Sequence, residues 1–219
     1  MKTVLVTGVS RGLGNAIAAA FAARGWDTIG VARSACRIPG VRTEQLDVCD
    51  EQAVTAFIGS LAKLDVVVNN AGIARYRPLL ETPTPELREI LEVNVIGAFN
   101  VMRETARRMV AQGGGLIINI ASDAAVKGIA QMAPYVASKH ALLGLARSVS
   151  AEMRGRGVRV CTYCPGAIST EILGPASMNP WALQPADIAG TIVHLADLPP
   201  GMEVQEMLVE PMGNIMHEG

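Results

Sequence analysis

The sequence predicts an α/β fold, and two observations carry that prediction. Short apolar runs rich in β-branched residues alternate along the 219-residue chain with longer stretches of helical character, which is the pattern of βαβ units. The first run, at residues 3–7, leads directly into a glycine-rich turn and then into an alanine-rich stretch. Strand, glycine turn and helix are typical of the opening of a nucleotide-binding sheet. We therefore expect a Rossmann-type, doubly wound parallel sheet of about seven strands, with helices on both faces.

The individual elements follow from the apolar periodicity. Strands are expected at residues 3–7, 27–32, 42–46, 64–69, 115–120, 158–163 and 206–210. Helices are expected at residues 12–24, 50–62, 85–111, 134–154 and 185–196. The stretch from Ser34 to Val41 holds Pro39 and Gly40 and is too short for a full crossover helix, so a loop or a single turn is expected there. Because no linker or internal repeat divides the chain, residues 1–219 are expected to form one domain.

Composition excludes several classes of protein. The formal charge is −1, which gives no basic surface for nucleic acid. Half of the residues are hydrophobic, but the apolar runs are too short to cross a bilayer, and the N-terminus enters the first strand without a signal peptide. We expect a cytoplasmic protein with no membrane partner.

The four cysteines do not indicate a metal site. Cys161 and Cys164 have CxxC spacing, but they fall in a predicted strand, where residues three apart point to opposite faces. No second Cys/His pair stands at zinc-ligand spacing, so we expect buried thiols and no metal.

The most informative chemical group is a tyrosine and a lysine four residues apart. Tyr135 and Lys139 lie on one face of a predicted helix, where the ammonium is expected to favour the phenolate and to bring proton exchange toward neutral pH. Ser122 follows the apolar run 116–121, at the carboxyl end of a predicted buried strand, where open α/β sheets bind ligands. Taken alone, a Tyr-x-x-x-Lys pair is more often a solvated helix face.

The glycine turn has an unusual spacing. Gly8, Gly12 and Gly14 follow the pattern Gly-x-x-x-Gly-x-Gly, not the standard Gly-x-Gly-x-x-Gly of dinucleotide-binding turns. Glycines let the backbone approach a pyrophosphate, although such a turn alone is more often only a tight turn.

Taken together, these residues resemble the short-chain dehydrogenase/reductase family. The matching segments are Thr7-Gly8-x-x-x-Gly12-x-Gly14, Asn69-Asn70-Ala71-Gly72, Asn94, Ser122, Tyr135-x-x-x-Lys139 and Pro165-Gly166, in the order and at the approximate spacing of the family. The resemblance covers residues 3 to about 170. It implies reversible hydride transfer between a nicotinamide and a carbonyl or alcohol carbon of a small substrate, with Tyr135 as general acid/base and Ser122 as a hydrogen-bond donor.

The resemblance also assigns site residues. The implied catalytic set is Asn94, Ser122, Tyr135 and Lys139, with Asn94 holding a relay water and Lys139 also bonding the nicotinamide ribose. Asn94 could instead be a polar group that satisfies local backbone, and Asp47 could be a helix N-cap rather than an adenine contact. The expected cofactor-binding residues are Gly8, Ser10, Arg11, Gly12, Leu13, Gly14, Arg33, Ser34, Asp47, Val48, Asn70, Ala71, Gly72, Tyr135, Lys139, Pro165, Gly166, Ile168 and Thr170.

The end of the second predicted strand favours NADP(H) over NAD(H). An NAD site places an Asp or Glu there, whereas this chain has Arg33 and no acid. A guanidinium can bind a 2′-phosphate bidentately, and Arg11 in the glycine turn can add a second cation. The alternative is that both arginines are solvated surface charges.

The sequence says less about which residues contact the substrate. The segment from Thr170 to Gln184 is expected to form a shortened loop over the site, with Met178 and Trp181 as apolar walls or, for the tryptophan, as a buried anchor. Arg75 could bind a substrate carboxylate or lie on the surface, and Asp123 could contact a polar substrate or stabilise its turn.

The C-terminal segment departs from the Asp-Gly-Gly ending that many family members have. Residues 207–212 and the segment from Gln184 resemble instead the members that act on small hydroxy acids and related alcohols. A homotetramer or homodimer is implied by family analogy. The competing function is a catalytically idle NADP(H)-binding sensor or scaffold.

Overall fold

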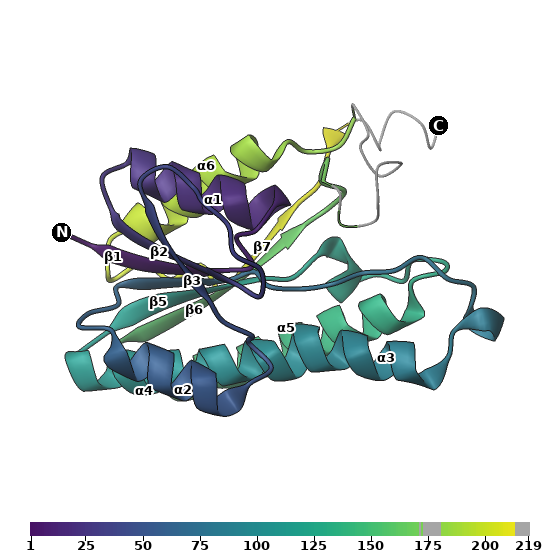
Figure 1. The fold of residues 1–219 in the computed structure, drawn as a ribbon, viewed down its shortest axis with the longest axis horizontal. Coiled ribbons are helices and arrows are strands. Elements are labelled where there is room, and N and C mark those ends of the chain that lie inside the picture. Colours follow the sequence, from purple (N-terminus) through teal and green to yellow (C-terminus); the bar gives the residue numbers. More distant parts are fainter. Residues whose placement is uncertain (171, 173–180, 213–219) are drawn as a thin grey trace.

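Seven parallel strands form a single sheet in the computed structural model, which describes residues 1–170, 172 and 181–212 (Figure 1). The strands are β1 (Thr3–Thr7), β2 (Asp27–Ala32), β3 (Val41–Gln45), β4 (Val66–Asn69), β5 (Gly115–Ile120), β6 (Val158–Pro165) and β7 (Glu206–Val209). Their order across the sheet is β3-β2-β1-β4-β5-β6-β7. The chain reverses its direction of travel across the sheet between β1 and β4, and such switch points are where doubly wound sheets bind ligands. The predicted fold class is confirmed.

Helices cover both faces of the sheet. The longer helices are α1 (Gly12–Ala23), α2 (Glu51–Ser60), α3 (Thr84–Leu91), α4 (Ala98–Gln112), α5 (Ala133–Met153) and α6 (Pro185–Asp197). Figure 1 shows α1 and α6 side by side on one face and α2, α4 and α5 on the other. Shorter helical turns are η1 (Leu79–Glu81), η2 (Glu92–Gly97), η3 (Asp123–Ala125) and η4 (Arg154–Arg156). None of the helices in the described part of the chain is long and apolar enough to span a membrane.

The strands divide the core into two layers, because successive side chains of a strand point to opposite faces. Leu5, Val67 and Ile117 belong to the cluster under α2, α4 and α5. Val4 and Ile118 belong to the cluster under α1 and α6. Since both faces are covered, the central strands read as continuous apolar runs, and this made them visible in the sequence.

One predicted helix differs from the structure. A single helix was expected over residues 85–111, but α3 and α4 are joined by η2, in which Glu92–Gly97 winds as a π-helix. Single π-helical turns inside longer helices occur frequently at functional sites. Here the wider turn includes Asn94, which is buried.

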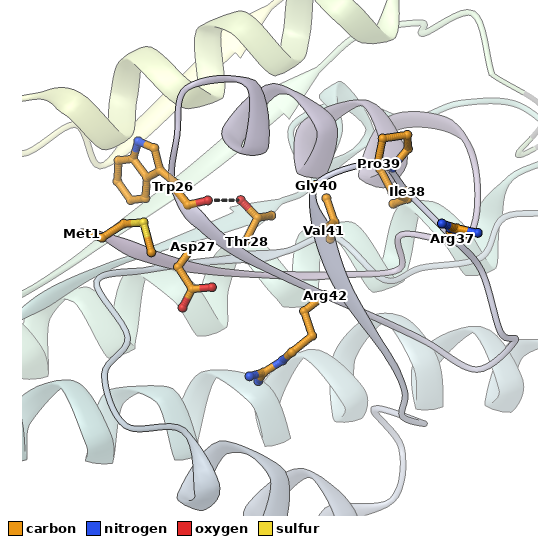
Figure 2. Close-up of a pocket in the computed structure, with 10 residues that line it drawn as sticks. All are labelled: Met1, Trp26, Asp27, Thr28, Arg37, Ile38, Pro39, Gly40, Val41 and Arg42. Atoms are coloured by element: carbon orange, nitrogen blue, oxygen red, sulfur yellow. Dashed lines mark hydrogen bonds between the residues drawn. The ribbon is translucent and has the colours of Figure 1, made fainter.

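The connection between β2 and β3 contains no helix, as predicted. Ile38, in the middle of this loop, is buried, and the Thr43 hydroxyl donates to the Cys36 carbonyl oxygen at 2.8 Å. This loop forms one side of a pocket of about 530 Å³ at the amino ends of β2 and β3, lined by Trp26, Asp27 and Arg42 among others (Figure 2). No residue of the predicted site lines this pocket.

The four cysteines are all free thiols, and Cys161 and Cys164 are buried in β6. No group of three or more His, Cys, Asp or Glu residues within the described ranges could hold a metal ion.

Candidate active site

A cavity of about 970 Å³ lies at the carboxyl ends of the strands, where the sheet topology switches. It is bounded by the turn after β1, the ends of β2 to β6, the short helix η3 and the first turns of α5. Of the residues predicted for the site, all except Asn94 line this cavity. Segments that are far apart in the sequence therefore meet around one hollow.

The glycine turn is shaped by backbone conformation and by close packing. Gly8 and Gly12 have φ of +74° and +59°, a region that L side chains rarely adopt. A Cβ on Gly14 would collide with the Gly8 carbonyl oxygen and the Asn70 amide nitrogen. No described side chain caps the amino end of α1, so the first N–H groups of this helix are available to an anion at the cavity wall.

Asn70 ties the end of β4 to the end of β1. Its side-chain nitrogen donates to the Thr7 carbonyl oxygen at 2.9 Å. The Thr7 hydroxyl in turn accepts from the backbone nitrogens of Asn70 and Ala71, both at 2.9 Å. The Asn70 amide thus positions the Asn-Asn-Ala-Gly turn, and its side chain is already used within the protein.

Asn94 lies behind the cavity wall. Its side-chain oxygen accepts from the Ile73 backbone nitrogen at 2.8 Å, and its nitrogen donates to the Ile73 carbonyl oxygen at 2.9 Å. The same nitrogen donates to the Ser138 hydroxyl at 3.0 Å, and Ser138 donates to the Tyr135 carbonyl oxygen at 2.7 Å. The backbone groups that Asn94 binds belong to Ile73, 21 residues away, and not to its own helix, and its bond to Ser138 joins η2 to the turn of α5 that carries Tyr135 and Lys139.

Ser122 and Tyr135 form the polar centre of the cavity. A hydrogen bond with Ser122 lowers the pKa of the phenol, but burial outweighs it, and the nearby Asp123 carboxylate acts in the same direction as burial. The net result raises the pKa of Tyr135 to about 12. The expected downward shift is therefore wrong for the protein without a bound cofactor, because the side chain is desolvated.

Lys139 is buried beside this tyrosine. Its ammonium nitrogen donates to the Ile120 carbonyl oxygen at 2.9 Å and lies 5.5 Å from the centre of the Tyr135 ring. Burial lowers the pKa of Lys139 to about 8, with the Cys164 thiol opposing the shift. At neutral pH the side chain is still mostly a cation, so a positive charge lies under the ring.

The cofactor end of the cavity is positively charged. Arg33 follows β2 and Arg11 lies in the glycine turn; both are exposed, and neither forms an ion pair with another described residue. Asp47 accepts from the Cys49 backbone nitrogen at 3.0 Å, and α2 is capped by Asp50 instead. The alternative of Asp47 as the helix N-cap is therefore wrong, and its side chain lines the cavity.

The part of the cavity expected to receive the substrate has mostly apolar walls. Those side chains are Ile73, Val93, Ile129, Met132 and Ile172, to which Tyr76 and Asp123 add polar groups. The segment after β6 is held at its base, where Ile168 pairs with Leu183. Met178 lies outside the described residues.

Two residues considered for the substrate end lie elsewhere. Arg75 forms a bidentate ion pair with Glu89, at 2.8 and 3.0 Å, and does not line the cavity. Trp181 is 58% exposed and is also not part of the cavity wall, so it is not a buried anchor.

Two supporting residues were not predicted from the sequence. Ser138 connects Asn94 to Tyr135, as described above. Asn69, the first asparagine of its motif, donates to the Ala98 carbonyl oxygen at 2.9 Å and to the Asn119 side chain at 3.3 Å, inside the core. Asn69 belongs to the quoted Asn-Asn-Ala-Gly motif but was not assigned a role, and for Ser138 the only sequence signal was a polar residue on a predicted buried helix face.

A glycine turn suited to phosphate and a Ser–Tyr–Lys cluster share one cavity at the switch point of a parallel sheet. This combination defines a dinucleotide-dependent oxidoreductase. The chain belongs to the short-chain dehydrogenase family, whose model matches residues 2–180.

Individual relatives agree with this assignment. The chain is 35% identical to the D-threitol dehydrogenase of Mycolicibacterium smegmatis over 78% of its length and 72% of that protein. It is 34% identical to an NADPH-dependent pterin aldehyde reductase of Arabidopsis thaliana, over 87% and 85% of the two chains. Among solved structures, an alcohol dehydrogenase of the archaeon Thermococcus sibiricus, complexed with 5-hydroxy-NADP, superposes with a TM-score of 0.88 at 29% identity, covering 97% of each chain.

Proposed function

We propose that this protein is an NADP(H)-dependent oxidoreductase that transfers a hydride between nicotinamide and a carbonyl or secondary alcohol carbon of a small substrate. The observation that carries the proposal is the continuity of one cavity from the glycine turn to the Ser122–Tyr135 pair. A single extended ligand in this cavity would then contact a phosphate-binding end and a proton-transfer end.

The residues present fit NADP(H). Gly12 has room for a pyrophosphate beside it, since a Cβ there would meet only the Thr170 side chain, at 3.6 Å. Arg33 and Arg11 would hold the 2′-phosphate, and Asp47 and Val48 would contact the adenine. Two of the solved structures similar to this one contain NADP or NADPH and share 26% and 25% identity with it. Lys139 would bond the nicotinamide ribose, and residues 166–170 would contact the carboxamide.

The protein's own groups would handle the proton. When bound, the nicotinamide supplies or accepts the hydride and, in its oxidised form, adds a positive charge. Tyr135 donates its proton to the substrate oxygen in reduction and takes it back in oxidation. Ser122 stabilises the negative charge that develops on that oxygen. With the pKa of Tyr135 near 12 in the free protein, the cations of the complete complex are needed to make the phenol exchange protons at neutral pH.

The substrate class follows from the cavity wall. Around Ser122 and Tyr135, apolar side chains and the Asp123 carboxylate favour a small, uncharged carbonyl compound or alcohol, and the related threitol dehydrogenase and pterin aldehyde reductase act on an alcohol and an aldehyde by their names. The ion pair of Arg75 with Glu89 gives no support to a hydroxy acid bound through that arginine. We also propose a cytoplasmic homodimer or homotetramer, as the sequence and the family lead us to expect.

The test is a panel of aldehydes, ketones and polyols followed by NADPH absorbance in the reducing direction and by NADP⁺ reduction in the other. We expect turnover with at least one member of the panel and a clear preference for NADPH over NADH. Tight NADPH binding without turnover on any compound would instead support the sensor or scaffold.

A further inference from the structure

A chain of charged side chains runs from the cavity to the protein surface next to Ser122. The Ser122 hydroxyl donates to Asp123 Oδ1 at 2.8 Å. The other carboxylate oxygen of Asp123 lies 2.9 Å from the Lys127 ammonium, which also contacts a Glu210 oxygen at 2.9 Å. Four side chains from two segments, residues 122–127 and the end of β7, are thus linked one after another.

The first link holds the Ser122 oxygen in place. A serine hydroxyl has one hydrogen to donate and two lone pairs that can accept. In this structure that hydrogen is directed at Asp123 Oδ1; to stabilise a charged substrate oxygen, as proposed above, the hydroxyl turns and donates to that oxygen in place of Asp123. The backbone nitrogen of Ala124 donates to both Ser122 Oγ, at 3.2 Å, and Asp123 Oδ1, at 2.8 Å, and so holds the two acceptors in register.

The second link balances the charge of Asp123. A carboxylate one residue from Ser122 opposes formation of a phenolate on Tyr135, and Asp123 has this effect on the tyrosine. The Lys127 ammonium is ion-paired with the same carboxylate and therefore offsets part of its field. The pairing with Asp123 and Glu210 raises the pKa of Lys127, so the lysine stays charged throughout the working range of pH.

The other ionisable groups around Tyr135 are few. Within the described residues, Lys139 lies under the ring from α5, and the Cys164 thiol approaches Lys139 from β6. Ser122, which precedes η3, and Asp123, which begins it, also act on the phenol, and Lys127 and Glu210 are ion-paired next to Asp123. Asp123 is accordingly the anion that acts directly on the phenol.

The last link comes from the C-terminal segment that distinguishes this chain. Glu210 follows β7, and Gly166 of the expected nicotinamide-binding segment packs against it, because a Cβ on Gly166 would lie 2.9 Å from Pro211 and 3.4 Å from the Glu210 Cα. The backbone nitrogen of Gly166 donates to the Val209 carbonyl oxygen at 2.7 Å. The end of β7 therefore supports both the cofactor segment and the anchor of Lys127.

We propose that Asp123 and Lys127 are positioning residues: Asp123 holds the Ser122 side chain in place and adds a negative charge beside Tyr135, and Lys127, anchored by Glu210, offsets that charge. The inference rests on the proposed role of Tyr135 as the acid/base. It predicts that loss of the anion and loss of the cation shift the pH at which Tyr135 ionises in opposite directions. A merely structural role for either residue does not predict opposite shifts.

The experiment is a pH titration of phenolate absorbance in the free protein and in its complex with NADP⁺. Tyr135 is isolated as the difference between each variant and the same variant carrying Tyr135→Phe, since the chain has three tyrosines. Asp123→Asn keeps an oxygen for Ser122 but removes the charge, and Lys127→Met removes the cation. Lys127→Arg tests rescue, and Lys63→Met, which breaks the exposed pair with Asp65, is the control for loss of a surface lysine.

We expect Asp123→Asn to lower the pKa of the Tyr135 phenol by about 0.5 to 1 unit. Lys127→Met should raise this pKa by a smaller amount, because Lys127 is half exposed and its charge is partly screened. At any alkaline pH before full ionisation, the phenolate content then falls in the order Asp123→Asn, wild type, Lys127→Met. Lys127→Arg and Lys63→Met should match the wild type.

Shifts in the same direction, or no shift in either variant, would overturn the inference. The proposed function has a separate point of failure: if turnover survives Tyr135→Phe, the acid/base role is wrong, whatever the titrations show. An intact acid/base role together with unmoved titrations would contradict the Asp123–Lys127 inference alone.

Discussion

The side-chain amide of Asn94 donates to the Ser138 hydroxyl at 3.0 Å, across the junction between the π-helical turn η2 and α5. Ser138 lies one turn from Tyr135 and directly before Lys139, and its hydroxyl donates to the Tyr135 carbonyl oxygen. Asn94 also binds both backbone polar groups of Ile73. One buried amide thus connects the segment after β4, the π-helical turn and the helix that carries the proposed acid/base.

Replacing Asn94 should therefore cost more stability than replacing its partner. Asn94→Ala loses three hydrogen bonds and should lower the free energy of unfolding by about 2–4 kcal/mol, whereas Ser138→Ala should cost about 1 kcal/mol. Urea unfolding of both variants and of the double mutant measures the difference and the coupling. If the two single variants lost equal stability, the amide would not be the main tie between these segments.

Cofactor preference should depend on Arg33. Arg33→Asp removes charge-assisted bonds to a 2′-phosphate and adds a repulsive charge, so we expect the Kd for NADPH to rise at least about tenfold and by up to on the order of a hundredfold. NADH, which lacks that phosphate, should be affected much less. The matched control is Arg42→Asp, an exposed arginine on β3 outside the cavity (Figure 2). Equal weakening of NADPH and NADH by Arg33→Asp would rule out the 2′-phosphate role.

Lys139 should destabilise the cofactor-free protein at neutral pH. Burial lowers its pKa from 10.5 to about 8, so the unfolded chain binds the proton more strongly between these values. Stability due to this lysine therefore rises as pH increases through that window, by about 3 kcal/mol in full, and its cost is greatest below pH 8. Lys139→Met should unfold at higher urea concentration than the wild type at neutral pH, even though it loses the bond to Ile120.

The advantage of Lys139→Met should shrink as the pH is raised toward 10. Lys63→Met, which removes an exposed lysine, should show no comparable dependence on pH. A stability difference between Lys139→Met and the wild type that stays constant over this range would contradict the depressed pKa of Lys139.

Much of the fold could be predicted from the sequence, because both sides of the sheet are covered and its strands are continuous apolar runs. The π-helical turn could not, since the periodicity over residues 85–111 is helical in either case and one widened turn leaves it almost unchanged. The trimmed connection after β2 was visible because Pro39 and Gly40 interrupt any helix there.

The sequence indicated which residues meet at the cavity, but not how buried or how paired their side chains are. The spacing of Tyr135 and Lys139 brings the two side chains together, yet it says nothing of their desolvation, which sets the direction of both pKa shifts. Arg75 looked available to a substrate because its ion pair with Glu89 depends on the tertiary fold. Lys127 and Glu210 are 83 residues apart in the sequence, so no local pattern could predict their contact.

The central claim is that Tyr135 exchanges the proton with the substrate oxygen, and Tyr135→Phe tests it most directly. The variant should be assayed for turnover with a substrate found in the panel and, in parallel, for NADPH binding. Removing only the hydroxyl should lower kcat/KM on the order of a thousandfold while leaving the Kd for NADPH nearly unchanged. Turnover that stays close to that of the wild type would contradict the assignment.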